Sequence, residues 1–277
     1  MLIKKRGGSS SRREISHFLD SLVTEGALSY GEIVKSANYC NIPLYSPYIC
    51  ALISFTEQNR LLQTSEWLGT SALLRSQLAD KWEMLSGNIS YAFAKYNNVI
   101  LVLQQSESLP VYEQVALVRE YCGDLMKMLS AKGQDRGVIF GIGDPVPSLA
   151  EFCRSYSQAL RTVDLASRIC DERIATYRRY ILCELIYDSP NAKLALIQRI
   201  KPLLAYDEEH NTQLLYTLET YFNNCQNSVK TSKALFIHRN TLLYRLDRIA
   251  EILDLNYNDS EQMLTFQLAL KAFLMCQ

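Results

Sequence analysis

Hydrophobic residues recur at helical spacing near the end of the chain. On a helix that turns by about 100° per residue, one side collects four apolar residues: Leu242, Leu246, Ile249 and Leu253. The opposite side collects hydrogen-bonding side chains: Asn240, Thr241, Tyr244, Asp247 and Arg248. The pattern predicts a helix that packs one side into a core and turns the other side outward.

A shorter helix is predicted directly before this one. Asn227 and Ser228 are its candidate caps, because short polar side chains accept hydrogen bonds from free backbone N–H groups at a helix start. Ala234 and Leu235 are its expected inward positions. Only Phe236-Ile237-His238 separates the two helices, and a turn of this length sets two helices at a steep angle. The segment is therefore predicted to be a helix-turn-helix.

This segment has excess positive charge in a chain that is otherwise neutral, with 29 basic and 29 acidic residues. Between Ser228 and Ala250 the one acid is Asp247, and the bases are Lys230, Lys233, Arg239, Arg245 and Arg248. A local excess of this kind favours a surface that faces phosphates. A solvated helical hairpin is the alternative, but the Asn, Thr, Tyr and Arg side chains at the start of the second helix are types that reach DNA base edges.

We therefore expect contact with double-stranded DNA through one set of residues: Lys230, Lys233, His238, Arg239, Asn240, Thr241, Tyr244, Arg245 and Arg248. Asn240 lies in the first turn of the second helix, where a side chain enters the major groove and can pair with adenine. Arg245 lies on the flank and can reach a base edge or a phosphate. Lys233, on the first helix, is expected to reach only the DNA backbone.

The same residues resemble a known family. The resemblance rests on His238-Arg239-Asn240-Thr241-Leu242-x-Tyr244-Arg245-Leu246, preceded by Ala234-Leu235-Phe236-Ile237 and followed by Gln267-Leu268-Ala269-Leu270-Lys271. These strings are similar to the end of the bacterial purine-catabolism and carbohydrate-diacid regulators (PucR/CdaR type), which carry a Fis-like helix-turn-helix. Leu243 stands where the family commonly has arginine, and Ser232 where it commonly has alanine. The missing charge at Leu243 either removes a phosphate contact or marks a packing site.

Upstream of residue 188, patterns typical of strands alternate with patterns typical of helices. Helices are predicted at 12–23, 30–39, about 65–85, 111–132 and 148–170. Strands are predicted at 48–55, 89–95, 99–104, 138–142 and 174–177. The second and third strands are joined across Tyr96-Asn97-Asn98, where asparagine tolerates the positive φ of a tight hairpin. This order predicts a sheet covered by helices, an α/β sandwich.

The predicted order resembles the catalytic domain of diguanylate cyclases. Gly141-Ile142-Gly143-Asp144-Pro145 and Ser155-Tyr156-x-x-Ala159 are similar to the degenerate, GGDEF-like version in the regulator family. An active cyclase has Gly-Gly-Asp-Glu-Phe at its central hairpin, whose acids serve metal binding and catalysis. The corresponding string here is Asn97-Asn98-Val99-Ile100-Leu101. Because magnesium requires oxygen ligands, the resemblance implies a domain with no catalytic residues and no cofactor.

The two glycines of the first string fit two interpretations. Gly141 and Gly143 follow a predicted strand, so they could form a phosphate cradle, but a Gly-x-Gly pair at this place more often forms a strand-to-helix turn. Asp144 is expected to belong to that turn.

A break at Tyr187-Asp188-Ser189-Pro190-Asn191 separates the parts, because proline restricts the residue before it and is poorly tolerated inside a helix. We predict an N-terminal helical lead at 1–45, the degenerate GGDEF-like domain at 46–188 and the helix-turn-helix domain at 189–277. Further helices in the last domain are predicted at 192–205, 211–224 and 261–275. The predicted class is α+β, an α/β sandwich followed by an all-α domain.

Composition narrows the function classes. The chain has 277 residues, of which 48% are hydrophobic and 21% charged, enough for two domain cores. Its longest apolar run, Val99 to Leu103, is far shorter than a membrane span, so we expect no membrane association and a cytoplasmic location. The cysteines stand at 40, 50, 122, 153, 170, 183, 225 and 276 without a C-x-x-C pair, which predicts reduced, packed thiols. His17, His210 and His238 are far apart, and no metal site is expected.

The sequence as a whole predicts a sequence-specific, DNA-binding transcriptional regulator that is not an enzyme. It is expected to form a homodimer through the region before Pro190, and a small-molecule effector is a further candidate partner. Two alternatives stay open: a module that senses a nucleotide or metabolite, and a protein-interaction scaffold with weakened DNA binding. The family usually has a sensory domain ahead of this region, so the chain is a short form, a fragment, or a protein that receives its signal in another way.

Overall fold

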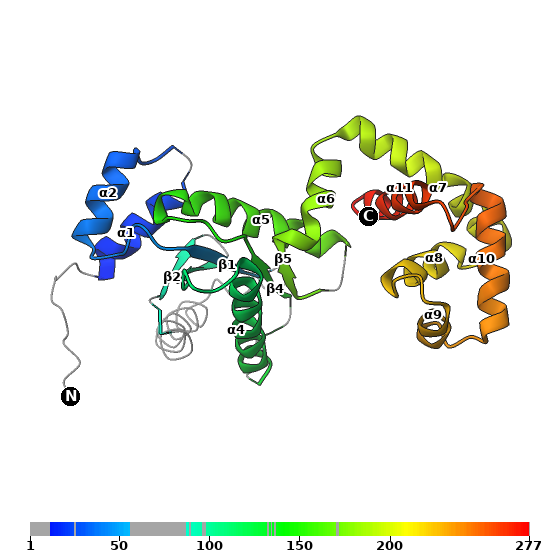
Figure 1. Ribbon diagram of the computed structural model, residues 1–277, viewed down its shortest axis with the longest axis horizontal. Coiled ribbons are helices and arrows are strands. Elements are labelled where there is room, and N and C mark those ends of the chain that lie inside the picture. Colours follow the sequence, from blue (N-terminus) through cyan, green and yellow to red (C-terminus); the bar gives the residue numbers. More distant parts are fainter. Residues whose placement is uncertain are drawn as a thin grey trace. The chain divides into compact units, whose positions relative to one another are not determined.

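The computed structural model describes residues 12–24, 26–55, 87–88, 90–95, 98–131, 133, 135, 137–169 and 172–276 (Figure 1). The chain divides into two compact units, Met1–Tyr180 and Ile181–Gln277. The division falls inside α6 (Tyr177–Tyr187), a helix that the sequence pattern did not predict. The boundary predicted after residue 188 directly follows this helix and stays a prediction.

Unit 1 contains a five-stranded sheet of order β2-β3-β1-β4-β5. The strands are β1 (Tyr48–Phe55), β2 (Ser90–Lys95), β3 (Asn98–Gln104), β4 (Val138–Ile142) and β5 (Ile174–Thr176). The central strand β1 pairs antiparallel with β3 and β4, whereas β4 and β5 are parallel. All five predicted strands are confirmed. Lys95 pairs with Asn98, and the other two residues of the predicted turn lie outside the described residues, as does the helix predicted at about 65–85.

Helices cover both faces of this sheet, which confirms the predicted α/β sandwich. Besides the start of α6, the helices in the described residues of unit 1 are α1 (Arg12–Leu22), α2 (Tyr30–Tyr39), α4 (Val111–Ala131), the 3-10 turn η2 (Leu149–Glu151) and α5 (Phe152–Ile169). Side chains of β1 alternate between the two faces. Tyr48 and Cys50 join the core under α1, α2 and α5, and Ile49 and Ala51 join the core under α4.

The backbone of α5 lies unusually close to the end of β4. A Cβ atom at Gly141 would overlap the carbonyl oxygen of Ala159, and one at Gly143 would overlap that of Ser155. The hydroxyl of Ser155 also accepts a hydrogen bond of 2.9 Å from the backbone N–H of Cys50 in β1. The two glycines and the small residues of α5 therefore form one packing interface, and α5 fills the space that a phosphate cradle would need.

Unit 2 is all-helical, as predicted. Its helices are α7 (Pro190–His210), α8 (Leu214–Asn223), α9 (Ser228–Ala234), α10 (Arg239–Leu253) and α11 (Ser260–Leu274), after the last turns of α6. Their apolar sides form one core, which includes Ile200 of α7, Leu218 of α8 and Phe266 of α11. The four apolar residues predicted on one side of α10 are all buried in this core. Helix α7 extends five residues beyond the predicted end and contains Pro202.

Replacement of Gly141 or Gly143 by alanine should destabilise unit 1. Each substitution places a methyl group into the α5 backbone, and overpacking of this kind costs about 1–3 kcal/mol of the free energy of unfolding. Urea unfolding of the full chain, followed by circular dichroism, measures the effect. Gly31→Ala is the matched control, because Gly31 lies in α2 and its Cβ would meet no atom within 4 Å. If Gly141→Ala unfolds with the same urea midpoint as the parent, this account of the packing is wrong.

Candidate nucleic-acid interface

The first helix of the motif, α9, is short and tightly capped. The side chain of Asn227 accepts a hydrogen bond of 3.0 Å from the backbone N–H of Lys230, so the predicted cap is confirmed. The buried residues of α9 are Thr231 and Ser232, whose hydroxyls donate to backbone carbonyls of the same turn. The predicted inward position of Ala234 is wrong, because α9 ends there and leaves Ala234 exposed.

The turn between the two helices has a defined hydrogen-bond pattern. The backbone N–H of Phe236 donates to the carbonyl of Lys233 at 3.2 Å, and that of Ile237 donates to Ser232 at 3.0 Å. This pair of bonds is the Schellman pattern, which closes a helix with one left-handed residue. That residue is Phe236, with φ 54°. The turn fixes where α10 begins.

His238 caps the second helix. Its ring nitrogen Nδ1 accepts a hydrogen bond of 3.2 Å from the backbone N–H of Asn240. The backbone carbonyl of His238 accepts from Thr241 at 3.0 Å. The imidazole therefore organises the first turn of α10 while the residue stays exposed to solvent.

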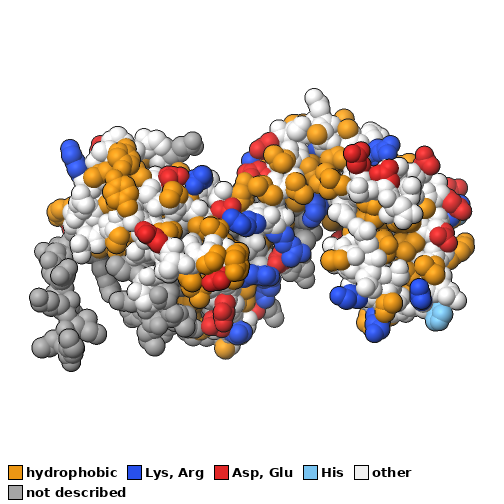
Figure 2. Space-filling view, in the orientation of Figure 1, with side chains coloured by type: hydrophobic (Ala, Val, Ile, Leu, Met, Phe, Trp, Pro, Cys, Tyr) orange, Lys and Arg blue, Asp and Glu red, His pale blue; other side chains and the backbone are white. Residues whose placement is uncertain are grey.

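Seven of the predicted DNA-contacting residues are exposed on α9, the turn and the first turns of α10: Lys230, Lys233, His238, Arg239, Asn240, Thr241 and Tyr244. Figure 2 shows Lys, Arg and His side chains along the rim of unit 2 where these segments lie. The N-terminus of a helix also favours anions, because its first N–H groups point outward. We call these seven residues the basic face.

Two predicted residues are engaged inside unit 2 instead. Arg245 is half-buried, and its guanidinium donates a 3.2 Å hydrogen bond to the hydroxyl of Thr217, a fully buried residue of α8. Both residues of this pair belong to the packing between α8 and α10. The sequence could not assign Arg245, because a residue on the flank of a helix can turn its long side chain toward either face.

Arg248 is the second engaged residue. Its guanidinium lies 4.8 Å from the ring centroid of Tyr206 in α7 and 2.6 Å from a carboxylate oxygen of Glu251. The hydrogen bond with Glu251 is the main cause that raises the pKa of Arg248 above its usual range. A DNA contact by Arg245 or Arg248 stays a prediction, and each guanidinium already contacts a partner within unit 2.

Phe236 is the surface residue that the sequence pattern missed. The sequence pattern places Phe236 in the turn and predicts no role for it, yet 95% of its surface is exposed. A signal was available, since a phenyl ring rarely occupies the left-handed position at the end of a helix. Leu243, the departure from the family pattern, is 40% exposed, so both interpretations of it stay open.

The hairpin of β2 and β3 is the one that resembles the catalytic hairpin of a cyclase. Neither of these two strands contains an Asp or Glu residue. Val99 and Ile100, which the resemblance places at the positions of the cyclase acids, are both fully buried in β3. Within the described parts of the chain, no group of three His, Cys, Asp or Glu side chains could hold a metal ion. These buried side chains pack the sheet and offer no oxygen ligand.

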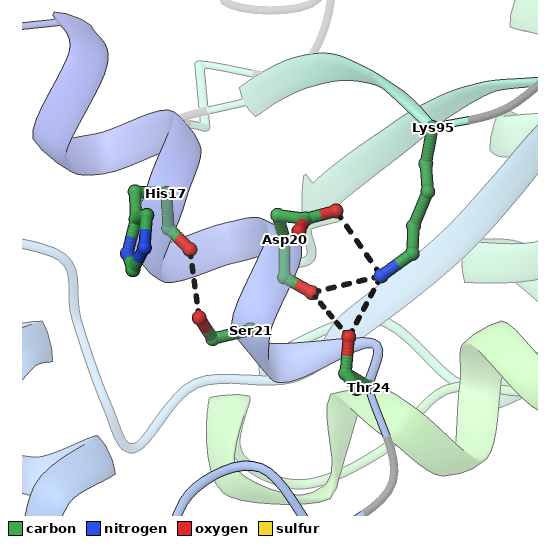
Figure 3. A network of polar contacts seen from close by, with 5 residues as sticks. All are labelled: His17, Asp20, Ser21, Thr24 and Lys95. Atoms are coloured by element: carbon green, nitrogen blue, oxygen red, sulfur yellow. Dashed lines mark hydrogen bonds and ion pairs between the residues drawn. The ribbon is translucent and has the colours of Figure 1, made fainter.

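Lys95, at the end of β2 beside this hairpin, is tied to α1 (Figure 3). Its ammonium group lies 3.1 Å from the carboxylate of Asp20 and donates to the hydroxyl of Thr24 at 2.7 Å. The Thr24 hydroxyl in turn donates to the backbone carbonyl of Asp20, and Ser21 donates to that of His17. This network connects α1 to the hairpin. It also engages Lys95, the basic residue of β2, with partners of its own.

A hollow of about 680 Å³ lies beside α4 and β5, lined by Ala116, Arg119, Glu120, Glu172, Arg173 and Ile174. Its arginines are already paired: Arg119 with Glu172 at 3.1 Å, and Arg173 with Asp135 at 3.0 Å. A nucleotide would have to displace these carboxylates, so the hollow gives the nucleotide-sensing alternative no specific support.

The cysteines follow the expected pattern only in part. Cys40, Cys50, Cys122 and Cys183 are buried, and burial raises the pKa of the Cys50 and Cys122 thiols well above the usual range. These thiols are therefore protonated and inert at neutral pH. Cys225 and Cys276 are exposed, contrary to the expectation that the thiols are packed, because both lie in irregular segments at the ends of α8 and α11.

Among the described helices, none is long and apolar enough to cross a membrane.

Two family models match the chain, one in each unit. Residues 25–165 match the GGDEF-like domain, and residues 214–272 match the PucR C-terminal helix-turn-helix domain. The first match covers half of the chain and includes four of the five strands, β1 to β4. The second includes the whole basic face.

Curated relatives agree with these matches. The chain is 24% identical to the purine catabolism regulatory protein of Bacillus subtilis (strain 168), over 94% of this chain and 49% of that protein. It is 27% identical to the proline-responsive transcriptional activator PutR of the same organism, over 63% of this chain and 43% of that protein. It is 30% identical to the carbohydrate diacid regulator of Escherichia coli (strain K12), over 47% of this chain and 34% of that protein. The chain thus spans at most about half the length of these relatives.

A solved structure, the regulator of polyketide synthase expression from Bifidobacterium adolescentis, matches with 14% identity and a TM-score of 0.39, over 95% of this chain and 98% of that one. The two family models, together with the purine-catabolism and carbohydrate-diacid relatives, identify the chain as a member of the PucR/CdaR family of bacterial transcriptional regulators, with a GGDEF-like domain followed by a PucR-type helix-turn-helix domain.

Proposed function

We propose that this protein is a sequence-specific DNA-binding transcriptional regulator that uses the basic face of unit 2 to bind double-stranded DNA. The observation that carries the proposal is the separation of polar and apolar sides on α10. Its apolar side is buried in the core, and the exposed side of its first turns presents Asn240, Thr241 and Tyr244. Because bacterial DNA lies in the cytoplasm, the proposal implies a cytoplasmic location.

The proposed division of contacts follows from side-chain chemistry. Lys230, Lys233 and Arg239 are exposed cations that can neutralise phosphates without reading sequence. Asn240 is an amide with donor and acceptor, which can pair bidentately with adenine in the major groove. Phosphate contacts would supply most of the affinity, and Asn240 would supply discrimination between sites.

The GGDEF-like domain is proposed to serve without catalysis, by pairing two subunits and relaying a signal to unit 2. Two observations support this. Apolar, buried Val99 and Ile100 stand at the positions of the catalytic acids, and the neighbouring Lys95 is held by Asp20 and Thr24.

Asn240→Ala and Lys233→Ala should separate base recognition from backbone contact. Asn240→Ala is expected to weaken binding to a selected cognate site by about 1–3 kcal/mol and to leave binding to random DNA nearly unchanged. Lys233→Ala should weaken binding to the cognate site and binding to random DNA by similar factors. Titration of labelled DNA at fixed salt measures both affinities, and circular dichroism first establishes that each variant is folded. If both folded variants bind both DNAs as the parent does, the basic face is only solvated and the proposed function is wrong.

Subunit pairing has its own test. A two-fold dimer presents two copies of α10, so the preferred operator should be near-palindromic with half-sites a multiple of about 10 base pairs apart. Sedimentation equilibrium gives the mass of the chain in solution, and selection from random DNA gives the half-site spacing. A chain that sediments as a monomer and binds a single half-site as tightly as a full site would refute the dimer.

The absence of catalysis can be measured directly. Incubated with GTP and magnesium, the full chain should form no cyclic dinucleotide, because the hairpin has no acids to bind the metal. Chromatography of the products, with an active diguanylate cyclase as positive control, provides the readout. Product in proportion to the amount of chain added would reopen the enzyme class.

A further inference from the structure

The turn of the helix-turn-helix contains the most exposed large hydrophobic side chain of the described residues. Phe236 is 95% exposed, whereas Tyr244, the other strongly exposed aromatic residue of this surface, is 72% exposed. A single exposed hydrophobic residue is common on protein surfaces. What distinguishes Phe236 is the backbone conformation in which it stands.

Phe236 occupies a left-handed position that the turn requires. The two hydrogen bonds that end α9, from Phe236 to Lys233 and from Ile237 to Ser232, form only when the residue between the helices has positive φ. Glycine is the usual residue there, because a Cβ atom crowds the neighbouring carbonyl in this conformation. The φ of 54° at Phe236 is therefore strained for a residue with a bulky side chain.

Packing within the chain does not compensate for this strain, because almost the whole ring faces solvent. Of the five other left-handed residues besides glycines in the described parts of the chain, three are of the types that tolerate this conformation, Asn41, Asn211 and Asp254, and two are not, Cys225 and Gln226. Phe236 is the one among the six that carries an aromatic ring. Strained, exposed residues that the fold itself does not need are concentrated at functional sites. The position therefore points to a contact with something outside the chain.

The surroundings of Phe236 indicate what that contact is. Lys233 precedes it on α9, and His238, Arg239 and Asn240 follow it, all of them exposed members of the basic face. The ring therefore stands, along the chain, among the cations that are proposed to face the duplex. The apolar group that DNA presents in the major groove is the C5-methyl of thymine, a known partner for phenylalanine.

We propose that Phe236 places its ring against the methyl group of a thymine in the major groove, next to the base that Asn240 contacts. Phe236 is then a specificity-determining residue, and the strain of the turn is kept because glycine at this position would lose the contact. The inference rests on the proposed DNA-binding function and adds a chemical group and a residue to it.

Substitution of the protein and of the DNA together tests the proposal. The full-length parent first selects a site from random duplex DNA, and each thymine of that site is then replaced in turn by uracil, which lacks only the methyl group. Phe236→Gly removes the ring and suits the left-handed turn. Asn211→Gly is the matched control, because it places glycine at the left-handed cap of α7, where φ is 51°.

At one thymine, uracil should weaken binding of the parent about fourfold, the factor expected for losing burial of one methyl group. Phe236→Gly should bind the unmodified site at least about fourfold more weakly than the parent, and uracil at that thymine should then have no further effect. Asn211→Gly should behave as the parent. The melting temperature of Phe236→Gly should equal or exceed that of the parent, since glycine relieves the strain.

The other outcomes overturn the inference in distinguishable ways. If the parent selects no DNA, the proposed function itself fails. If the parent binds a selected site and Phe236→Gly binds it equally well, the ring makes no DNA contact and its exposure serves another partner. If Phe236→Gly is weaker but every uracil site affects it as it affects the parent, the ring contacts the DNA backbone instead of a methyl group. A lower melting temperature for Phe236→Gly would show that the ring supports the fold.

Discussion

Burial of one side of α10 determines which side chains unit 2 can offer to DNA. Leu242 and Ile249 are fully buried, and Leu246 and Leu253 nearly so, in the core shared with α7, α8 and α11. Each buried aliphatic side chain stabilises this orientation by about 1.5–3 kcal/mol, as an upper estimate. Rotation of the helix would expose all four, which no single surface hydrogen bond could offset. The outward direction of Asn240 and Tyr244 follows from this burial.

The same reasoning explains what the sequence could and could not predict. Four apolar residues at regular spacing specify the buried side of a fifteen-residue helix, so the stripe of α10 was predictable. Helix α9 has only seven residues, too few for a clear period, and its inward residues proved to be Thr231 and Ser232 instead of Ala234. Arg245 and Arg248 lie toward the flanks of α10, where the partners in α8 and α7 decide the side-chain direction. Those partners are distant in sequence, so no local pattern reveals them.

The GGDEF-like domain shows a similar contrast between local and distant causes. Its strands were predictable because their side chains alternate between two buried faces or are apolar throughout. The packing role of Gly141 and Gly143 was not predictable, because it depends on the carbonyls of Ala159 and Ser155 in α5. The structure thus has a close helix–sheet interface at one end of the strands, and Val99 and Ile100 are buried in the central hairpin.

The salt dependence of DNA binding tests the central claim most directly. If only Lys230, Lys233 and Arg239 contact phosphates, a dimer places six cations on the duplex, and the logarithm of affinity should fall with the logarithm of salt with a slope of about −5. A slope near −9 would mean that Arg245 and Arg248 also bind phosphates, contrary to the assignment of both side chains to contacts within unit 2. A slope near zero would mean that the basic face does not bind DNA.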